Sequence, residues 1–322
     1  MKTITSLVML LLLCSAPACA QDMSSHSNHA TAPAADTNET QEWARQRLAK
    51  SSRHQEWVKI KNGAREVNSF VVYPEVKNKA TAVIIIHEIF GMTDWVQSLT
   101  DQLAEAGYIA IAPDLLSGMG PNGGGTSSLT GNNAVGQAIR DLPPDQITAD
   151  LNAVAAYVSK LPASNGKIVV TGYCWGGSQS FRYATNNPNL KAAFVFYGSA
   201  PSATAQGQDP WQPDKTALAK IQAPVYGFYA GNDARINATL PATAAAMTEL
   251  KKTFDQVTYE GAGHGFMRAG DAPEPVAPQP KGEKEADDKA AADYQKSLTQ
   301  WKANKKARDE AWARWKKILA RI

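Results

Sequence analysis

The hexapeptide Gly172–Gly177 (GYCWGG) constrains the fold more than any other segment of the chain. It directly follows the β-branched run 167–171 (KIVVT), which is typical of a buried strand. A strand that ends in Gly-x-nucleophile-x-Gly and opens a helix forms a tight, strained turn, and this turn lifts the nucleophile, here Cys174, clear of the sheet. The turn also aims the first N–H groups of the helix at a reacting carbonyl. The alternative interpretation is a buried structural cysteine in a glycine-rich turn.

The rest of the chain alternates between apolar strands and amphipathic helices. The predicted strands are 57–60, 67–73, 82–86, 108–112, 192–197, 224–229 and 256–259, and the predicted helices are 94–106, 144–161 and 242–252. A continuous apolar strand such as 82–86 (AVIII) is expected where helices cover both faces of a parallel sheet. The pattern predicts an α/β fold in a single domain over residues 46–322, with one doubly wound, mostly parallel sheet.

Two segments interrupt this alternation. Residues 117–133 are rich in glycine, and we expect them to form a mobile loop near the site. They contain a formal GxGxxG at 118–123, but Pro121 and the lack of a following amphipathic helix argue against a dinucleotide site. Residues 271–306 begin Pro-rich, become charged, and are interpreted as an insert before the C-terminal helix.

The N-terminus has the features of an export signal. Residues 1–20 combine a positive start, an apolar centre and a small-residue cleavage site, so the mature chain is predicted to begin at Gln21. Residues 21–45 are expected to be a disordered tether. The protein is therefore predicted to be exported, periplasmic or secreted, with lipid anchoring at Cys19 as the less favoured alternative.

Composition excludes several classes of function. A formal net charge of +3, without basic clusters, does not suggest nucleic-acid binding, and no apolar run is long enough for a transmembrane segment. Because Cys14 and Cys19 lie in the export signal, Cys174 is expected to be the only thiol of the mature chain. With no cysteine cluster to bind a metal, we expect no metal and no cofactor.

A cysteine nucleophile needs a base, and the base needs an acid to orient it. Asp233 follows the predicted strand 224–229, and His264 follows the predicted strand 256–259. The chain order nucleophile, acid, base is the order expected when the nucleophile lies on a strand–turn–helix of the kind predicted around Cys174, called a nucleophile elbow. Taken singly, Asp233 could cap a turn and His264 could be an ordinary loop histidine.

The chain resembles the dienelactone hydrolase family of α/β hydrolases in four motifs: 88–91 (EIFG), 172–177 (GYCWGG), 231–233 (GND) and 263–268 (GHGFMR). The resemblance implies the α/β-hydrolase fold, with Cys174, Asp233 and His264 as the catalytic triad. It also implies that the chain cleaves an ester or lactone.

The same resemblance assigns four supporting residues. Glu88 matches the glutamate that contacts the resting thiol, and the backbone N–H groups of Ile89 and Trp175 would form the oxyanion hole. Arg268 matches an arginine that pairs with the substrate carboxylate. No residue, Arg140 included, can be matched to the second carboxylate-binding arginine, so the physiological substrate stays open.

The sequence thus predicts a hydrolase that cleaves activated carboxylic esters or lactones through a thioester acyl-enzyme on Cys174. The predicted partner is a small-molecule ester or lactone. The alternative is a catalytically idle, exported α/β-hydrolase-like module that binds a protein partner.

Overall fold

The computed structural model describes residues 41–131, 133–204 and 210–322. Residues Glu39–Ile322 form one compact unit. The predicted signal at 1–20 and all but the last five residues of the predicted tether at 21–45 lie outside the described residues. Among the helices that are described, none combines the length and apolar character needed to cross a bilayer.

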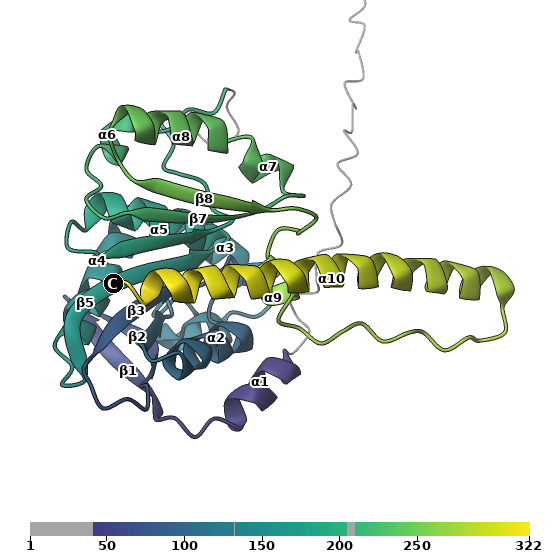
Figure 1. The fold of residues 1–322 in the computed structure, drawn as a ribbon. Helices are drawn as coiled ribbons and strands as arrows, with labels where there is room; N and C mark the ends of the chain where they lie inside the picture. The colour runs from purple at the N-terminus through teal and green to yellow at the C-terminus, as the bar shows by residue number, and fades with distance from the viewer. Residues whose placement is uncertain (1–40, 132, 205–209) are drawn as a thin grey trace, which may run out of the picture. The chain divides into compact units, whose positions relative to one another are not determined.

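The centre of the unit is an eight-stranded sheet in the order β1-β2-β4-β3-β5-β6-β7-β8 (Figure 1). The strands are β1 (Gln55–Asn62), β2 (Arg65–Val72), β3 (Ala80–Ile86), β4 (Ile109–Pro113), β5 (Ser164–Tyr173), β6 (Ala192–Phe196), β7 (Val225–Ala230) and β8 (Phe254–Tyr259). β1 and β2 pair antiparallel, as do β2 and β4, and every other neighbouring pair is parallel. The predicted α/β-hydrolase fold, with its mostly parallel sheet, is confirmed.

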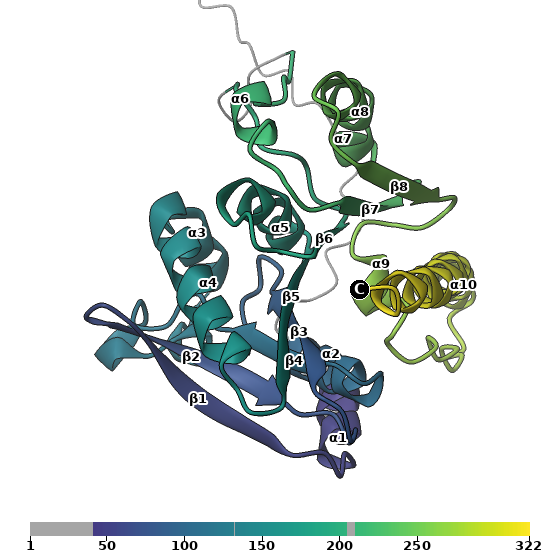
Figure 2. The ribbon, with the colours of Figure 1, turned by 60° about the vertical axis from the view of Figure 1, so that its left-hand side comes forward.

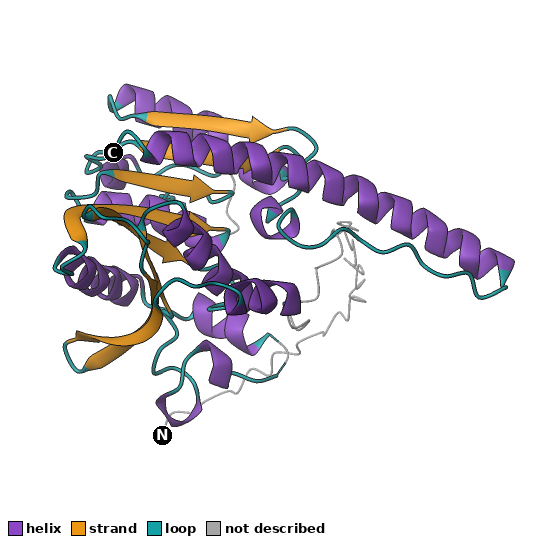
Figure 3. Cartoon of the chain, turned by 60° about the horizontal axis from the view of Figure 1, so that its bottom comes forward, coloured by secondary structure: helices purple, strands orange, loops and turns teal. Residues whose placement is uncertain are grey.

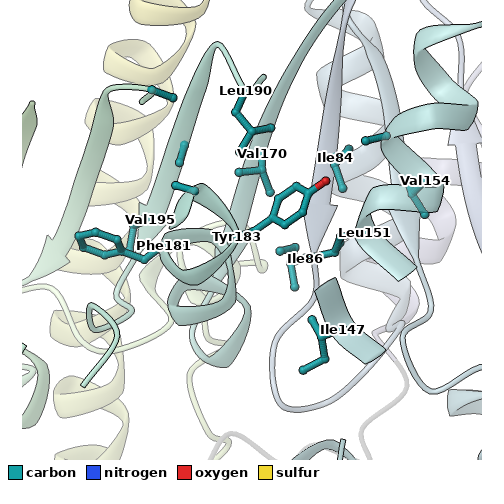
Figure 4. Packing of buried hydrophobic residues seen from close by; sticks show 14 of the residues in the cluster. Ile84, Ile86, Ile147, Leu151, Val154, Val170, Phe181, Tyr183, Leu190 and Val195 are labelled. Carbon is teal, nitrogen blue, oxygen red and sulfur yellow. The ribbon is translucent and has the colours of Figure 1, made fainter. Parts of the chain in front are cut away.

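Helices cover both faces of the sheet (Figure 2). On one face lie α3 (Ala134–Arg140), α4 (Pro144–Ser159), α5 (Trp175–Asn186), α6 (Lys215–Leu218), α7 (Ala234–Asn237) and α8 (Leu240–Glu249). On the other lie α1 (Glu42–Ala49), α2 (Asp94–Glu105), α9 (Phe266–Ala269) and α10 (Lys284–Leu319). The strands explain this arrangement, because successive side chains of a strand point to opposite faces. In β3, Ile84 and Ile86 belong to the first core (Figure 4), whereas Val83 and Ile85 belong to the second.

The C-terminal helix differs from its prediction. Residues 284–306, interpreted as the charged part of an insert, form one continuous 36-residue helix with the segment that follows. The second half of α10 buries Ala307, Ala311, Trp315 and Leu319, a stripe at helical spacing, against the sheet. Its first half extends away from the sheet (Figure 3). Tyr294, Leu298 and Trp301 lie at helical spacing within the predicted insert, but the many charged residues around them favoured an insert over one continuous helix.

Helix α1 is a second difference, since it starts at Glu42, within the predicted tether. Tertiary contacts hold it in place. Arg45 forms an ion pair with Asp94 at 2.9 Å, and the Gln41 side chain accepts a hydrogen bond from the backbone N–H of Trp95. Composition alone could not reveal these long-range partners.

Candidate active site

Cys174 lies at the sharp turn between β5 and α5, where its φ is 55° and its ψ is −119°. A positive φ is uncommon for a residue with a side chain, so the turn is strained and must be held by its surroundings. The flanking glycines are required for close packing. A Cβ on Gly176 would overlap the carbonyl oxygen of Ile86, and a Cβ on Gly177 would overlap the carbonyl oxygen of Phe196. The backbone N–H of Cys174 also donates to the Phe196 carbonyl at 3.1 Å.

The structure brings the three predicted triad residues together. The Nδ1 atom of His264 lies 2.5 Å from Oδ2 of Asp233. Burial alone would lower the pKa of His264, but the hydrogen bond to Asp233 and the nearby Asp233 and Cys174 side chains raise this pKa to about 10. Burial opposes ionisation of Asp233 as well, yet its hydrogen bond to His264 lowers the pKa of the carboxyl. The arrangement favours a charged imidazole between the carboxylate and the sulfur.

Asp233 and His264 come from loops at the carboxyl ends of neighbouring strands. Asp233 follows β7 and begins α7, where its Oδ1 accepts the N–H of Ile236 at 3.3 Å. The loop after β8 carries His264, and Gly261 and Gly265 flank it with φ values of 73° and 78°. Because β7 and β8 are parallel, the loops that follow them leave the sheet at the same edge. Asp233 therefore both caps a turn and binds the histidine.

Glu88 lies in a buried cluster beside the triad. Its Oε2 accepts a hydrogen bond from Nε of Arg268 at 2.7 Å, and its Oε1 lies 3.5 Å from the Tyr197 hydroxyl. The charge of Glu88 raises the pKa of Arg268. Glu88 therefore has two partners, Arg268 and Tyr197, that the resemblance did not imply.

Tyr197 is the residue of this cluster that sequence reasoning missed. It follows β6, has a φ of 40°, and packs its ring against His264 with the centroids 5.0 Å apart. Burial raises its pKa well above the ordinary value, so the phenol stays neutral and can donate to Glu88. The sequence offered one signal for it: Tyr197 lies at the carboxyl end of β6, which pairs with β5, the strand that leads into the turn at Cys174.

The two predicted oxyanion-hole residues lie on elements that touch each other. Trp175 is the first residue of α5, a position whose N–H has no partner within the helix. Ile89 lies in the loop after β3. The preceding His87 stacks on Trp175, with the ring centroids 5.5 Å apart and the planes 17° from parallel.

The glycine-rich segment is fastened to the same region. Buried Asp114 accepts hydrogen bonds from the backbone N–H and the hydroxyl of Thr126, at 2.8 and 2.7 Å. The Thr126 hydroxyl in turn accepts the N–H of Met92, in the loop after β3. The segment therefore lies near the site, as predicted, and these bonds hold it there. Helix α3, which follows it and was missed, packs close to Ile89 through Gly136.

Two grooves lie elsewhere. One, of about 760 Å³, is lined by the β1–β2 hairpin, including Lys59, Lys61 and Arg65, and another, of about 290 Å³, surrounds Asp271. The lining of neither groove includes Cys174, Asp233 or His264. Within residues 41–131, 133–204 and 210–322 no three metal-binding side chains cluster together.

Comparison with known proteins identifies the family. The sequence profile of the dienelactone hydrolase family matches residues 67–322. A protein of Yersinia pestis named "Putative carboxymethylenebutenolidase" is 33% identical over 185 residues, which are 57% of this chain and 67% of that protein. A protein of the same name from Saccharolobus solfataricus is 28% identical over 292 residues, covering 80% of this chain and 95% of that protein.

Solved structures agree on the fold. A crystal structure titled "Putative Dienelactone Hydrolase", from Klebsiella pneumoniae, superposes with a TM-score of 0.59 at 24% identity and covers 78% of this chain and 98% of that one. A "Dienelactone Hydrolase-like Promiscuous Phospotriesterase" from metagenomic libraries has a TM-score of 0.57 at 18% identity, covering 77% of this chain and 97% of that one. The chain therefore belongs to the dienelactone hydrolase family of α/β hydrolases and is a hydrolase of carboxylic esters or lactones.

Proposed function

We propose that the protein hydrolyses activated carboxylic esters or lactones through a Cys174–His264–Asp233 triad and a thioester acyl-enzyme. The observation that carries this proposal is the position of the His264 ring, which lies 2.5 Å from Asp233 and close enough to Cys174 for that side chain to raise the pKa of the imidazole. In this arrangement the imidazole accepts the proton of the thiol, and the buried carboxylate stabilises the positively charged ring that results.

The reaction follows from these contacts. The Cys174 thiolate attacks the carbonyl carbon, and the N–H groups of Ile89 and Trp175 stabilise the oxyanion that forms. The C–O bond then breaks, and the alcohol or enol leaves with the proton held by His264. A water molecule, deprotonated by His264, attacks the thioester, releases the carboxylic acid and restores the thiol.

The sulfur nucleophile limits the substrates. A thiolate is itself a good leaving group, so the tetrahedral intermediate proceeds to the thioester only when the departing oxygen also leaves readily. This favours enol lactones and aryl esters over amides.

Glu88 and Arg268 support this chemistry in the proposal. The ion pair between them neutralises the buried carboxylate of Glu88. The Arg268 Nε binds Glu88, which leaves the rest of the guanidinium fork for a substrate carboxylate. A panel of esters with and without a carboxylate tests this role, because Arg268→Ala should lose the preference for the charged members.

The decisive test of the activity is Cys174→Ala. We expect it to abolish hydrolysis of 4-nitrophenyl acetate, and Cys174→Ser should retain only a small fraction of the rate. Undiminished turnover by the alanine variant would refute the triad. Rapid alkylation of the wild-type thiol by iodoacetamide near neutral pH is expected as well, since an inert binding module would contain a slowly reacting, buried cysteine.

We further propose that the chain is exported and cleaved before Gln21, on the pattern of residues 1–20. Mass spectrometry of the protein from its native envelope tests this. An N-terminus at Gln21 without a lipid supports the soluble exported form. A lipid attached to Cys19 would show that the exported protein is anchored to the membrane instead.

A further inference from the structure

The loop that carries His264, residues 260–265 between β8 and α9, is hydrogen-bonded to side chains of the C-terminal helix α10. Asn304 in α10 accepts a hydrogen bond at its Oδ1 from the backbone N–H of Gly263, at 2.8 Å. Gly263 is the residue immediately before His264. One turn earlier in the helix, the Gln300 side chain donates to the carbonyl of Gly261 at 3.1 Å and to Oδ1 of Asn304 at 3.0 Å. Two backbone groups of the loop therefore bind side chains of α10.

Asn304 occupies an unusual position for an amide. It is 6% exposed and belongs to the buried stripe of α10, whose other members are Ala307, Ala311, Trp315 and Leu319. A buried polar side chain costs free energy unless it is hydrogen-bonded, so an apolar residue would suit the stripe better if packing were its only role. The bond to Gly263 gives the amide a specific partner.

The loop needs such a support because its own backbone is permissive. Gly261 and Gly265 have positive φ values, and a glycine-rich segment has many conformations available. On the side facing Asp233, Asn232 binds the loop through its backbone N–H, which donates to the carbonyl of Ala262 at 2.9 Å. Asn304 and Gln300 bind it on the side facing α10. Gly270, the residue that caps the C-terminus of α9, lies so close to α10 that a Cβ there would overlap the backbone carbonyl of Asn304.

We propose that Asn304, supported by Gln300, is a positioning residue that fixes the backbone next to His264 and thereby sets the distance between its imidazole and the Cys174 sulfur. It touches neither the substrate nor the reacting atoms, and it acts through the histidine. The inference rests on the proposed function of His264 as the base. Residue 304 lies within the segment that the sequence presents as a charged insert, so the assignment comes from the tertiary contact alone.

The test compares three variants of the full chain. Asn304→Leu removes the acceptor and leaves the Gly263 N–H unpaired. Asn304→Asp keeps an oxygen acceptor at the same place. Leu319→Ala is the matched control, because it weakens the packing of the same buried stripe at its far end, away from the loop. For each, kcat and KM for 4-nitrophenyl acetate, the pH dependence of Cys174 alkylation by iodoacetamide, and Tm are measured.

We expect Asn304→Leu to lower kcat by about 10- to 100-fold with KM within twofold of wild type, since misplacing a reacting group by about 1 Å can cost a factor of this size. Its alkylation profile should move to higher pH, because the imidazole no longer holds its distance to the sulfur. Asn304→Asp should recover to within about threefold of the wild-type kcat. The charged and titratable groups around His264 are Asp233, Cys174, Tyr197 and the Glu88–Arg268 pair, and all remain in these variants.

Leu319→Ala should lower Tm while leaving the alkylation profile unchanged. The positioning role is overturned if Asn304→Leu and Leu319→Ala change kcat equally, if the alkylation profile of Asn304→Leu stays at its wild-type pH, or if the aspartate variant fails to recover. Failure of the proposed function would look different, because Cys174→Ala would then remain active whatever happens at position 304.

Discussion

Replacing Asp233 by Asn tests the electrostatics of the site most directly. Asn retains an oxygen that can cap α7, and it ranks with Asp as an N-cap residue, so the fold should be preserved. What it removes is the negative charge 2.5 Å from Nδ1 of His264. The substitution therefore separates the role of the carboxylate in catalysis from its role in the turn.

The magnitude follows from the pKa of His264, which stands at about 10 instead of the ordinary 6.5. At 1.36 kcal/mol per pKa unit, this rise corresponds to an upper bound of about 5 kcal/mol. Part of this rise comes from Cys174, and the His264 side chain is 33% exposed, so the share of Asp233 after solvent screening is about 3 kcal/mol. If the triad acts as proposed, Asp233→Asn should lower kcat/KM by roughly a hundredfold at pH 7.

The pH dependence has a definite sign. Since the pKa of His264 is raised on folding, the stability that its charge contributes is fully present below about pH 6.5 and is lost as the pH rises through about 10. The difference in Tm between wild type and Asp233→Asn should therefore shrink between these two pH values. The alkaline limit of kcat/KM should also move to lower pH in the variant.

The assay is hydrolysis of 4-nitrophenyl acetate from pH 5 to 10, with thermal unfolding measured at the same pH values. Asp214→Asn is the matched control, because Asp214 caps the short helix α6 through Ala217 as Asp233 caps α7 through Ile236. Asp214→Asn should leave kcat/KM unchanged. The reasoning is refuted if Asp233→Asn hydrolyses the ester within about threefold of wild type and keeps the wild-type alkaline limit.

Three further predictions concern the surroundings of the sulfur. Gly176→Ala should destabilise the fold by more than about 2 kcal/mol, measured by urea unfolding, because its Cβ would overlap the Ile86 carbonyl oxygen; unfolding at the wild-type midpoint would contradict this. Tyr197→Phe keeps the buried ring and removes the hydroxyl, so kcat should fall by up to about tenfold while Tm stays within about 2 °C of wild type. A large loss of Tm would show instead that the hydroxyl is structural. Thr126→Val removes one hydrogen-bond donor to buried Asp114 and should lower the free energy of unfolding by about 1–3 kcal/mol. It should also make segment 117–133 more sensitive to proteases, and unchanged proteolysis would argue against the anchoring role.

Local sequence patterns predicted much of the fold and the place of the three candidate triad residues for identifiable reasons. The elbow at Cys174 was predictable because the glycines around it meet a steric requirement within a few residues. Asp233 and His264 were predictable because each follows its own strand, and parallel neighbouring strands end at one edge of the sheet. The strands and the helices α2, α4 and α8 were predictable to within a few residues for the same reason, since hydrophobic periodicity is a local property.

Other features depend on contacts between distant parts of the chain. Glu88 and Arg268 are 180 positions apart, and no pattern in either segment shows that they pair with each other. The positive φ of Tyr197 and its packing on His264 are likewise tertiary properties. The start of helix α1 was expected to belong to a tether, because its stabilising partners lie on α2. The continuity of α10 was missed because its first half is charged and only its second half is buried.

The sequence by itself determined the family and the alternation of strands and helices, and it singled out Cys174, Asp233 and His264 as the proposed triad. Each of these depends on short-range periodicity or on residues that the turns require. Only the tertiary structure decided how that chemistry is held. It placed the charge of Glu88 against Arg268, fastened segment 117–133 through Asp114, and brought Asn304 of a distant helix to the loop of His264. The physical reason is that hydrogen bonds and ion pairs act over a few ångströms, so their partners are chosen by packing and cannot be read from separation along the chain.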